Sequence, residues 1–364
     1  MDYIGFFRFC SSYIIEFERM KVAFIVPSLQ NLGPTIVVNT IIKHLCYNGV
    51  EMSVYYFDES EAMDFNCPVY KIVNNSPIDF DSFDIIHSNM YRPDKYVYHW
   101  KHRIRKAKIV TTIHQDIFRN LRYNYNCIIS VCFTPLWIKY IKKFDRKIFI
   151  SNTIKNLYSF ENSLVIHNGI DIEYNPQLAN QLYVEKIWKL KQHGYTLLGT
   201  YAAINRGKGI DQLIELARMR KDLGIVIIGN GKEKHALQLL ARRYNVNEQI
   251  LFLPYLHSPY NYLQHIDIYV MPSRNEGFGL AMIEAAMVGV PVICSNIPIF
   301  HEIFNENQVV FFDLENIDSL SEAVNIILSK YKYYKDSIYS YVMNHFTGEI
   351  MAKKYLNLYN SIVD

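Results

Sequence analysis

The chain has 364 residues, of which 50% are hydrophobic and 20% charged, and its formal net charge is +3. The length predicts two domains, and the composition excludes a disordered chain. The small net charge gives no support to nucleic-acid binding, and no recognition motif accompanies the basic residues. Six cysteines without a CxxC pair argue against a zinc site or a disulfide framework and favour a reducing cytoplasm.

The first 19 residues precede an apolar run that starts at Met20. They are apolar but interrupted by charges, and they lack the basic start, apolar run and cleavage site of a signal peptide. We interpret them as an extension upstream of an alternative start at Met20, and a membrane-touching helix is the alternative. No stretch of the sequence reaches the length of a membrane span.

In the first half of the chain, strand and helix patterns alternate. Residues 20–29 form a short apolar run typical of a strand buried on both faces, and 35–49 predict a helix that ends at Gly49. A strand, a glycine-containing loop, a helix and a strand are the start of a doubly wound parallel sheet. We expect further strands within residues 50–58, 83–90, 107–115, 127–134, 146–152 and 163–171.

A second cycle begins near Tyr195, with expected helices at 210–224 and 232–246. Its further strands are expected at 225–231, 249–255, 266–273 and 290–295. Two similar α/β domains therefore lie in series. The predicted boundaries are an extension at 1–19, a first domain at 20–172, a linker at 173–194, a second domain at 195–343, and a C-terminal helix at 344–364 that packs back toward the first domain.

Residues 273–295, SRNEGFGLAMIEAAMVGVPVICS, place Glu276 and Glu284 around a glycine-rich turn that opens a helix. Gly277 and Gly279 allow a sharp turn and the close approach of a ligand. The helix N-terminus suits a phosphate, Glu276 suits sugar hydroxyls, and Glu284 is placed to reach a ribose. The alternative is a glycine turn whose glutamates merely favour the helix N-terminus, and the spacing alone does not decide between the two.

These residues also carry a resemblance to a known family. EGFGLAMIE followed by VGVPVI resembles the signature of the retaining glycosyltransferases of group 1, or family 4. Four further motifs occur in the family's order, namely VIHNGID, KGIDQLIEL, IIGNG and DIYVMPSRNEGFG. The resemblance covers most of the chain and implies an α/β protein of the GT-B fold, with two Rossmann-like doubly wound domains facing across a cleft. The first would be the acceptor-side domain and the second the nucleotide-sugar-binding domain.

The resemblance also implies roles for individual residues. Glu276 would contact the donor sugar and Glu284 the ribose, while Lys208 would neutralise the diphosphate as it leaves. The alternative for Lys208 is a solvated loop lysine. The backbone of Phe278 to Leu280 would cap the diphosphate, and the base would lie near Gly229 and Gly231. The full prediction assigns catalysis to Glu276, Lys208 and His114, and donor binding to Arg206, Gly277, Phe278, Gly279, Leu280, Glu284, Gly33, Gly229 and Gly231.

The chain departs from the family pattern at two places. Ala203 occupies the position where the family usually has an arginine, and Arg206 is expected to supply this second charge. The loop QNLGP has one glycine, Gly33, where many members have two, although Gly33 still permits a close approach to the donor phosphate or the acceptor.

Two histidines end neighbouring predicted strands. His114 follows one strand where the family often has a histidine near the sugar or acceptor, and strand ends face the ligand crevice. His87 follows the strand before it. For both, an ordinary hydrogen-bonded crevice histidine is the alternative.

Two other enzyme classes fit less well. The first is a dinucleotide-binding enzyme. It is disfavoured because, in GNGKEK, Lys234 lies where the dinucleotide-binding fingerprint has its third glycine. The two acids of a glycosidase flank a water-accessible bond and do not share a phosphate-type turn.

The sequence therefore predicts a metal-independent retaining glycosyltransferase. It would move a sugar from a UDP-sugar or GDP-sugar to a hydroxyl of a carbohydrate or lipid-linked oligosaccharide, in the synthesis of a surface polysaccharide such as O-antigen, capsule or lipopolysaccharide. A GT-B epimerase or phosphorylase and a non-catalytic carbohydrate-binding homologue are the alternatives.

The expected location is the cytoplasm, or the inner face of the cell membrane. Basic and aromatic residues are interleaved at 99–108 and 139–147, which suits an anionic membrane surface. A solvated helix face is the alternative.

Overall fold

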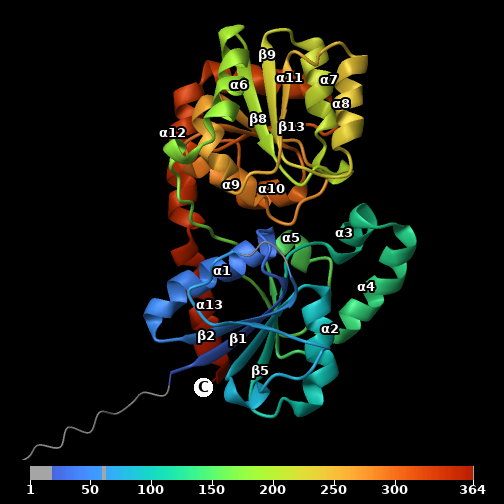
Figure 1. Ribbon diagram of the computed structural model, residues 1–364, viewed down its shortest axis with the longest axis vertical. Helices are drawn as coiled ribbons and strands as arrows, with labels where there is room; N and C mark the ends of the chain where they lie inside the picture. Colours follow the sequence, from blue (N-terminus) through green and yellow to red (C-terminus); the bar gives the residue numbers. More distant parts are fainter. Residues whose placement is uncertain (1–18, 60–62, 364) are drawn as a thin grey trace, which may run out of the picture.

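Two α/β units follow one another along the chain (Figure 1). The computed structural model describes residues 19–59 and 63–363. The predicted extension at the N-terminus therefore lies almost wholly outside the described residues.

The first unit contains a seven-stranded sheet in the order β3-β2-β1-β4-β5-β6-β7, and all its neighbouring strands are parallel. Its central strands are apolar on both faces because helices cover both sides. The strands are β1 (Lys21–Ser28), β2 (Glu51–Asp58), β3 (Val69–Lys71), β4 (Ile85–Asn89), β5 (Lys108–Ile113), β6 (Arg146–Phe149) and β7 (Ser163–Val165). The helices are α1 (Gly33–Leu45), α2 (Tyr91–Trp100), α3 (Ile117–Asn124), α4 (Cys127–Ile141) and α5 (Asn152–Lys155).

The second unit contains a six-stranded parallel sheet in the order β10-β9-β8-β11-β12-β13. Its strands are β8 (Thr196–Tyr201), β9 (Leu223–Ile228), β10 (Ile250–Leu253), β11 (Ile268–Met271), β12 (Val292–Ser295) and β13 (Val310–Phe312). Its helices are α6 (Gln181–Gln192), α7 (Asp211–Met219), α8 (Lys234–Arg243), α9 (Leu280–Met287), α10 (Pro298–Ile303), α11 (Ile317–Ser329) and α12 (Tyr331–His345).

The last helix, α13 (Gly348–Val363), returns to the first unit and packs against α1. Its buried Tyr359 hydroxyl lies 2.6 Å from His87 Nδ1, and Thr112 Oγ1 lies 2.8 Å from His87 Nε2. His87 is completely buried and does not line the cavity described below. Of the two interpretations of this residue, the structure therefore supports a hydrogen-bonded core histidine.

One expected strand is wrong. Residues 127–134 belong to α4, a helix of 15 residues. The Asn126 side chain caps it by accepting a hydrogen bond from the backbone N–H of Ile129 at 2.9 Å. A short, continuous apolar run does not distinguish a strand from a helix, and the capping asparagine just before the run is the signal that decides.

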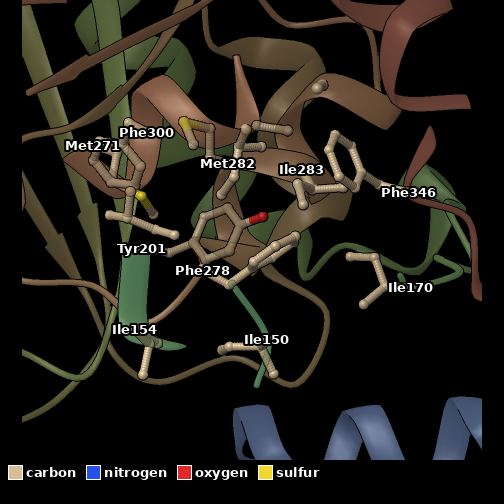
Figure 2. Packing of buried hydrophobic residues seen from close by; sticks show 14 of the residues in the cluster. Ile150, Ile154, Ile170, Tyr201, Met271, Phe278, Met282, Ile283, Phe300 and Phe346 are labelled. Carbon is tan, nitrogen blue, oxygen red and sulfur yellow. The ribbon is translucent and has the colours of Figure 1, made fainter. Parts of the chain in front are cut away.

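The two units share one apolar cluster at their joint. Ile150, Ile154 and Ile170 of the first unit and Phe278 and Phe346 of the second belong to this cluster, and Figure 2 shows Ile150 just below Phe278. The chain also crosses this joint twice, with the N–H of Ile170 donating to the carbonyl of Phe346 at 3.0 Å. This packing holds the carboxyl ends of both sheets toward each other. In each sheet the strand order reverses, between β1 and β4 and between β8 and β11, which is where doubly wound sheets bind ligands.

Candidate functional site

A cavity of about 950 Å³ lies between the carboxyl ends of the two sheets. Its walls come mainly from α1 and the loops after β1, β5 and β7 in the first unit and from the loops after β8, β9, β10 and β11 in the second. The volume is at the upper end of the range for ligand pockets, so it is large enough for two substrates together.

Lys208 and Glu276 form an ion pair within this cavity. Lys208 ends a 3₁₀ turn, Arg206–Lys208, which Gly209 closes with a positive φ of 62°. The exposed fractions of the Lys208 and Glu276 side chains are 24% and 11%, and Ser273 Oγ donates to the same carboxylate at 3.1 Å. Because the pair is shielded from water, its charges are screened much less than those of a surface pair. The structure thus brings together two of the three predicted catalytic residues.

The glycine turn after Glu276 is fixed by contact with the first unit. A Cβ on Gly277 would lie 2.2 Å from the carbonyl oxygen of His114, and Gly279, at φ 95°, is the N-cap of α9. The Phe278 side chain is buried at the joint, so only its backbone can serve a ligand. Leu280 begins α9, whose first N–H groups have no partner within the helix and therefore suit an anion.

Glu284 lies one turn into α9 and also lines the cavity. Tyr201, at the end of β8, donates its hydroxyl proton to Glu284 Oε2 at 2.6 Å. Burial raises the pKa of the Glu284 carboxyl, and the hydrogen bond from Tyr201 opposes that rise. The partly buried Glu284 side chain thus has its Oε2 held by Tyr201 while it lines the cavity.

His114 faces the cavity from the end of β5. Its Nε2 lies 2.9 Å from Asn89 Oδ1, and because that oxygen can only accept, Nε2 carries the proton and Nδ1 is free to accept. Burial lowers the pKa of His114 to about 3, so the ring is neutral near pH 7. Gly33 starts α1 across the cavity, and a Cβ added there would meet only Leu280 Cδ1, at 3.9 Å.

Two predicted donor-binding residues do not line the cavity. Arg206 is exposed and lies outside the lining, although Lys208 and Ala203 are part of it. Gly231 also lies outside it, whereas Gly229 lines it. Gly231 serves the local backbone, because a Cβ there would lie 2.1 Å from the carbonyl oxygen of Ile204.

The structure adds two residues that the sequence analysis missed. The first is Tyr201, which was missed because nothing in its sequence position distinguishes it from other strand residues. Asn168 is the other: it is 3% exposed and lines the cavity, and its Oδ1 has no hydrogen-bond partner among the described residues. Its position directly before Gly169 in VIHNGID was the available signal.

The cavity lining drawn from the described residues has two Lys or Arg side chains, Lys43 and Lys208. Lys43 pairs with Glu173 at 3.4 Å, and the exposed fractions of these two side chains are 47% and 89%. Ala203, at the position of the family arginine, contributes no charge to the lining. Within the described part of the chain, the cavity lining therefore has one shielded cation, Lys208, whose partner Glu276 precedes the glycine turn that leads into α9.

Two doubly wound units facing across a cavity are the GT-B architecture that the sequence analysis expects. The family model described as "Glycosyl transferases group 1" matches residues 185–340, and the one described as "Glycosyltransferase Family 4" matches residues 33–174. The chain therefore belongs to the group 1, or family 4, glycosyltransferases and is a glycosyltransferase.

Relatives agree with this assignment. The chain is 34% identical over 353 residues to the O-antigen biosynthesis glycosyltransferase WclY of Escherichia coli, a match that covers 94% of this chain and 99% of the relative. It is 25% identical over 177 residues to the lipopolysaccharide core biosynthesis mannosyltransferase LpsB of Rhizobium meliloti, covering 46% of this chain and 50% of LpsB.

Solved structures confirm the predicted fold. Sucrose-phosphate synthase of Thermosynechococcus elongatus superposes with a TM-score of 0.77 at 16% identity, covering 94% of this chain and 99% of that one. HepE of Anabaena, solved in complex with UDP and glucose, superposes with a TM-score of 0.76 at 14% identity, covering 94% and 100%.

Proposed function

We propose that the chain transfers a sugar from a nucleoside diphosphate sugar to an acceptor hydroxyl, with retention of anomeric configuration and without a metal ion. The observation that carries this proposal is the shielded Lys208–Glu276 pair at the N-terminus of α9. A diphosphate needs positive charge and N–H donors, and a transferred sugar needs a carboxylate for its hydroxyls. Both requirements meet at this point of the cavity.

The donor would lie along the second unit. Its diphosphate would contact Lys208 and the first N–H groups of α9, and its ribose would hydrogen-bond to Glu284. Charge develops on the diphosphate as the glycosidic bond breaks, and a fixed ammonium group stabilises that charge. Lys208 and the helix end would thus take the role that a divalent cation has in other transferases.

The acceptor would approach from the first unit, against His114 and Asn168. Neutral His114 can accept a hydrogen bond at Nδ1, and Asn168 presents an Oδ1 without a partner among the described residues, so both suit sugar hydroxyls. With no protein nucleophile assigned, we infer a front-face reaction in which the leaving phosphate takes the proton of the incoming hydroxyl.

The relationship to WclY supports a role in surface polysaccharide synthesis, with O-antigen as the product class. We propose a carbohydrate or lipid-linked oligosaccharide as the acceptor and the inner face of the cell membrane as the location. No helix in the described part of the chain is long and apolar enough to cross a membrane.

The test combines a panel of UDP-sugars and GDP-sugars with a lipid-linked oligosaccharide acceptor in the presence of EDTA. We expect one donor to add a single sugar to the acceptor by mass spectrometry, with the anomeric configuration of the donor by NMR. The Glu276→Gln variant should lose this activity. An inverted product, or activity that EDTA abolishes and Mg²⁺ restores, would contradict the mechanism. A donor that is epimerised or cleaved with no gain of acceptor mass would contradict the reaction type.

A further inference from the structure

A carboxylate at the joint, that of Glu302 in α10, accepts hydrogen bonds from the start of α5 in the first unit. Its Oε1 accepts from the backbone N–H of Asn152 at 2.6 Å and from the Asn152 side-chain amide at 3.1 Å. Its Oε2 accepts from the backbone N–H and from the hydroxyl of Thr153, both at 2.7 Å. Figure 1 shows α10 and α5 facing each other where the two units meet. These four hydrogen bonds tie the second unit to the first.

A fifth hydrogen bond to the same carboxylate comes from the residue before Asn168. The Nε2 of His167 lies 2.8 Å from Glu302 Oε1. The centroid of the His167 ring also lies 5.8 Å from that of Phe278 and 6.2 Å from that of Phe346. His167 is therefore held by side chains of the second unit, although it belongs to the first.

The Glu302 carboxylate is ionised at neutral pH, although only 13% of its side chain is exposed. Burial raises its pKa, but the hydrogen bonds from His167, Thr153 and Asn152 outweigh burial and lower that pKa to about 2. Because an ionised carboxylate can only accept, His167 Nε2 carries the proton. Hydrogen bonds to an ionised acceptor are stronger than those between neutral groups. We call Glu302 and its three partner residues the Glu302 clamp.

The clamp reaches the cavity through Asn168. This residue is 3% exposed and lines the cavity, and its Oδ1 has no hydrogen-bond partner among the described residues. The backbone on either side therefore determines where that oxygen lies. On one side, a Cβ on Gly169 would lie 2.1 Å from the carbonyl oxygen of Thr347, so the chain packs directly on the joint. On the other side, Glu302 holds His167.

We propose that Glu302 is a positioning residue for sugar transfer, which holds Asn168 in place across the cavity from the glycine turn after Glu276. The acceptor hydroxyl bound by Asn168 would then meet the donor sugar in the correct geometry. Neither Glu302 nor His167 lines the cavity, so the effect passes through the backbone of 167–168. The role of Asn168 as an acceptor contact rests on the proposed function, whereas the clamp itself does not.

Donor binding should not depend on the clamp. Lys208 and Glu284, the proposed donor contacts, both belong to the second unit. Glu284 receives its hydrogen bond from Tyr201 of the same unit. Loss of the clamp should therefore reduce the use of the acceptor without weakening the binding of a nucleoside diphosphate, whereas loss of a merely structural residue would reduce both.

The first test compares Glu302→Ala with Glu306→Ala, which removes an exposed glutamate just past α10. For Glu302→Ala, kcat/KM for the lipid-linked oligosaccharide of the transfer assay should fall at least about tenfold, because a small misplacement of reacting groups is costly. Its Kd for UDP, GDP or ADP, whichever the wild type binds, should stay within about twofold. Glu302→Gln keeps one accepting oxygen and should recover part of the loss, and Glu306→Ala should match the wild type.

A double variant separates positioning from general weakening. If Glu302 acts through Asn168, Glu302→Ala should cause no further loss of acceptor use in an Asn168→Ala background. Fully additive losses would overturn the proposal. A loss of nucleotide binding by Glu302→Ala as large as its loss of acceptor use would overturn it as well.

Hydrogen exchange tests the clamp without any substrate. In Glu302→Ala the backbone amides of Asn152 and Thr153 lose their acceptor, so exchange over 151–155 and 166–169 should become at least about tenfold faster. Exchange over 196–201, in β8, should not change. Unchanged exchange over 166–169 would overturn the proposal even if activity fell.

The two proposals fail in different ways. If the wild type transfers sugar and Glu302→Ala does so equally well, the positioning role is wrong and the proposed function stands. If the wild type transfers sugar to no acceptor, the proposed function is wrong, and the exchange over 166–169 decides by itself whether Glu302 positions Asn168.

Discussion

The two walls of the cavity each have a lysine paired with a glutamate, but the two pairs differ in their exposure to water. Lys208 and Glu276 of the second unit have 24% and 11% of their side chains exposed. Lys43 and Glu173, contributed from the first unit's side, have 47% and 89% exposed. Water screens the charges of the exposed pair, so their interaction energy is small. The charges of the shielded pair are screened less and interact more strongly with a charged ligand in the cavity. Burial, and not the presence of a lysine, therefore identifies the wall that would bind the diphosphate.

The largest effect should come from removing the shielded lysine. Lys208→Ala takes away the fixed charge that stabilises the leaving diphosphate, so kcat should fall roughly 10²- to 10³-fold. The matched control is Lys43→Ala, the other cavity lysine, which should change kcat less than about threefold. Equal losses in the two variants would remove the distinction between the walls.

A second effect should come from the contact between the walls. Gly277→Ala would place a Cβ 2.2 Å from the backbone carbonyl oxygen of His114, and neither backbone can yield without moving the two units apart. We expect kcat/KM to fall about a hundredfold, because a displacement of this size misplaces reacting groups. Circular dichroism should show an intact fold.

The matched control for that variant lies on the opposite wall. Gly33→Ala meets only the flexible end of Leu280 at 3.9 Å, so its loss of activity should be much smaller. If both variants are fully active, the contact between the walls is unnecessary for catalysis.

A smaller effect, visible in the pH profile, is expected at Tyr201. The hydrogen bond from Tyr201 lowers the pKa of Glu284 against the effect of burial, so Tyr201→Phe should raise that pKa. Protonated Glu284 is a poorer acceptor for ribose hydroxyls. The acid limb of kcat/KM should therefore move to higher pH, with the donor KM raised about tenfold at neutral pH. Tyr260→Phe, which leaves the Glu284 hydrogen bond in place, should keep the wild-type profile.

The smallest effect is expected at Arg206. Its side chain is exposed and outside the cavity lining, so Arg206→Ala should change donor KM and kcat less than about threefold. A loss comparable to that of Lys208→Ala would show that Arg206 reaches the donor during turnover and supplies the charge absent at Ala203.

The second wall could be predicted from the sequence more fully than the first. Its residues lie close together in the chain around one glycine turn, so the family resemblance of this one segment indicated both Glu276 and Glu284, and the structure places both in the cavity lining. The buried strands β1 and β9 were also predictable, because each is a short apolar run followed directly by a glycine-containing turn.

The first wall depends on contacts between distant residues. The partner of His114 is Asn89, from another strand, and the space open to Gly277 is set by the backbone oxygen of His114, which belongs to the other unit. One residue of the second wall, Tyr201, could not be assigned for the same reason, since its partner Glu284 lies in another element. The helix α4 was mistaken for a strand because its apolar outer face is exposed, which hides the usual polar periodicity of a surface helix.

The measurement that tests the central claim most directly is calorimetric titration of the wild-type protein, without metal, with UDP, GDP and ADP. The account predicts that one of these nucleoside diphosphates binds, that Lys208→Ala abolishes this binding, and that Lys43→Ala preserves it. Absence of binding by all three nucleotides, or equal binding by wild type and Lys208→Ala, would contradict the claim that the shielded lysine of the second wall holds the donor diphosphate.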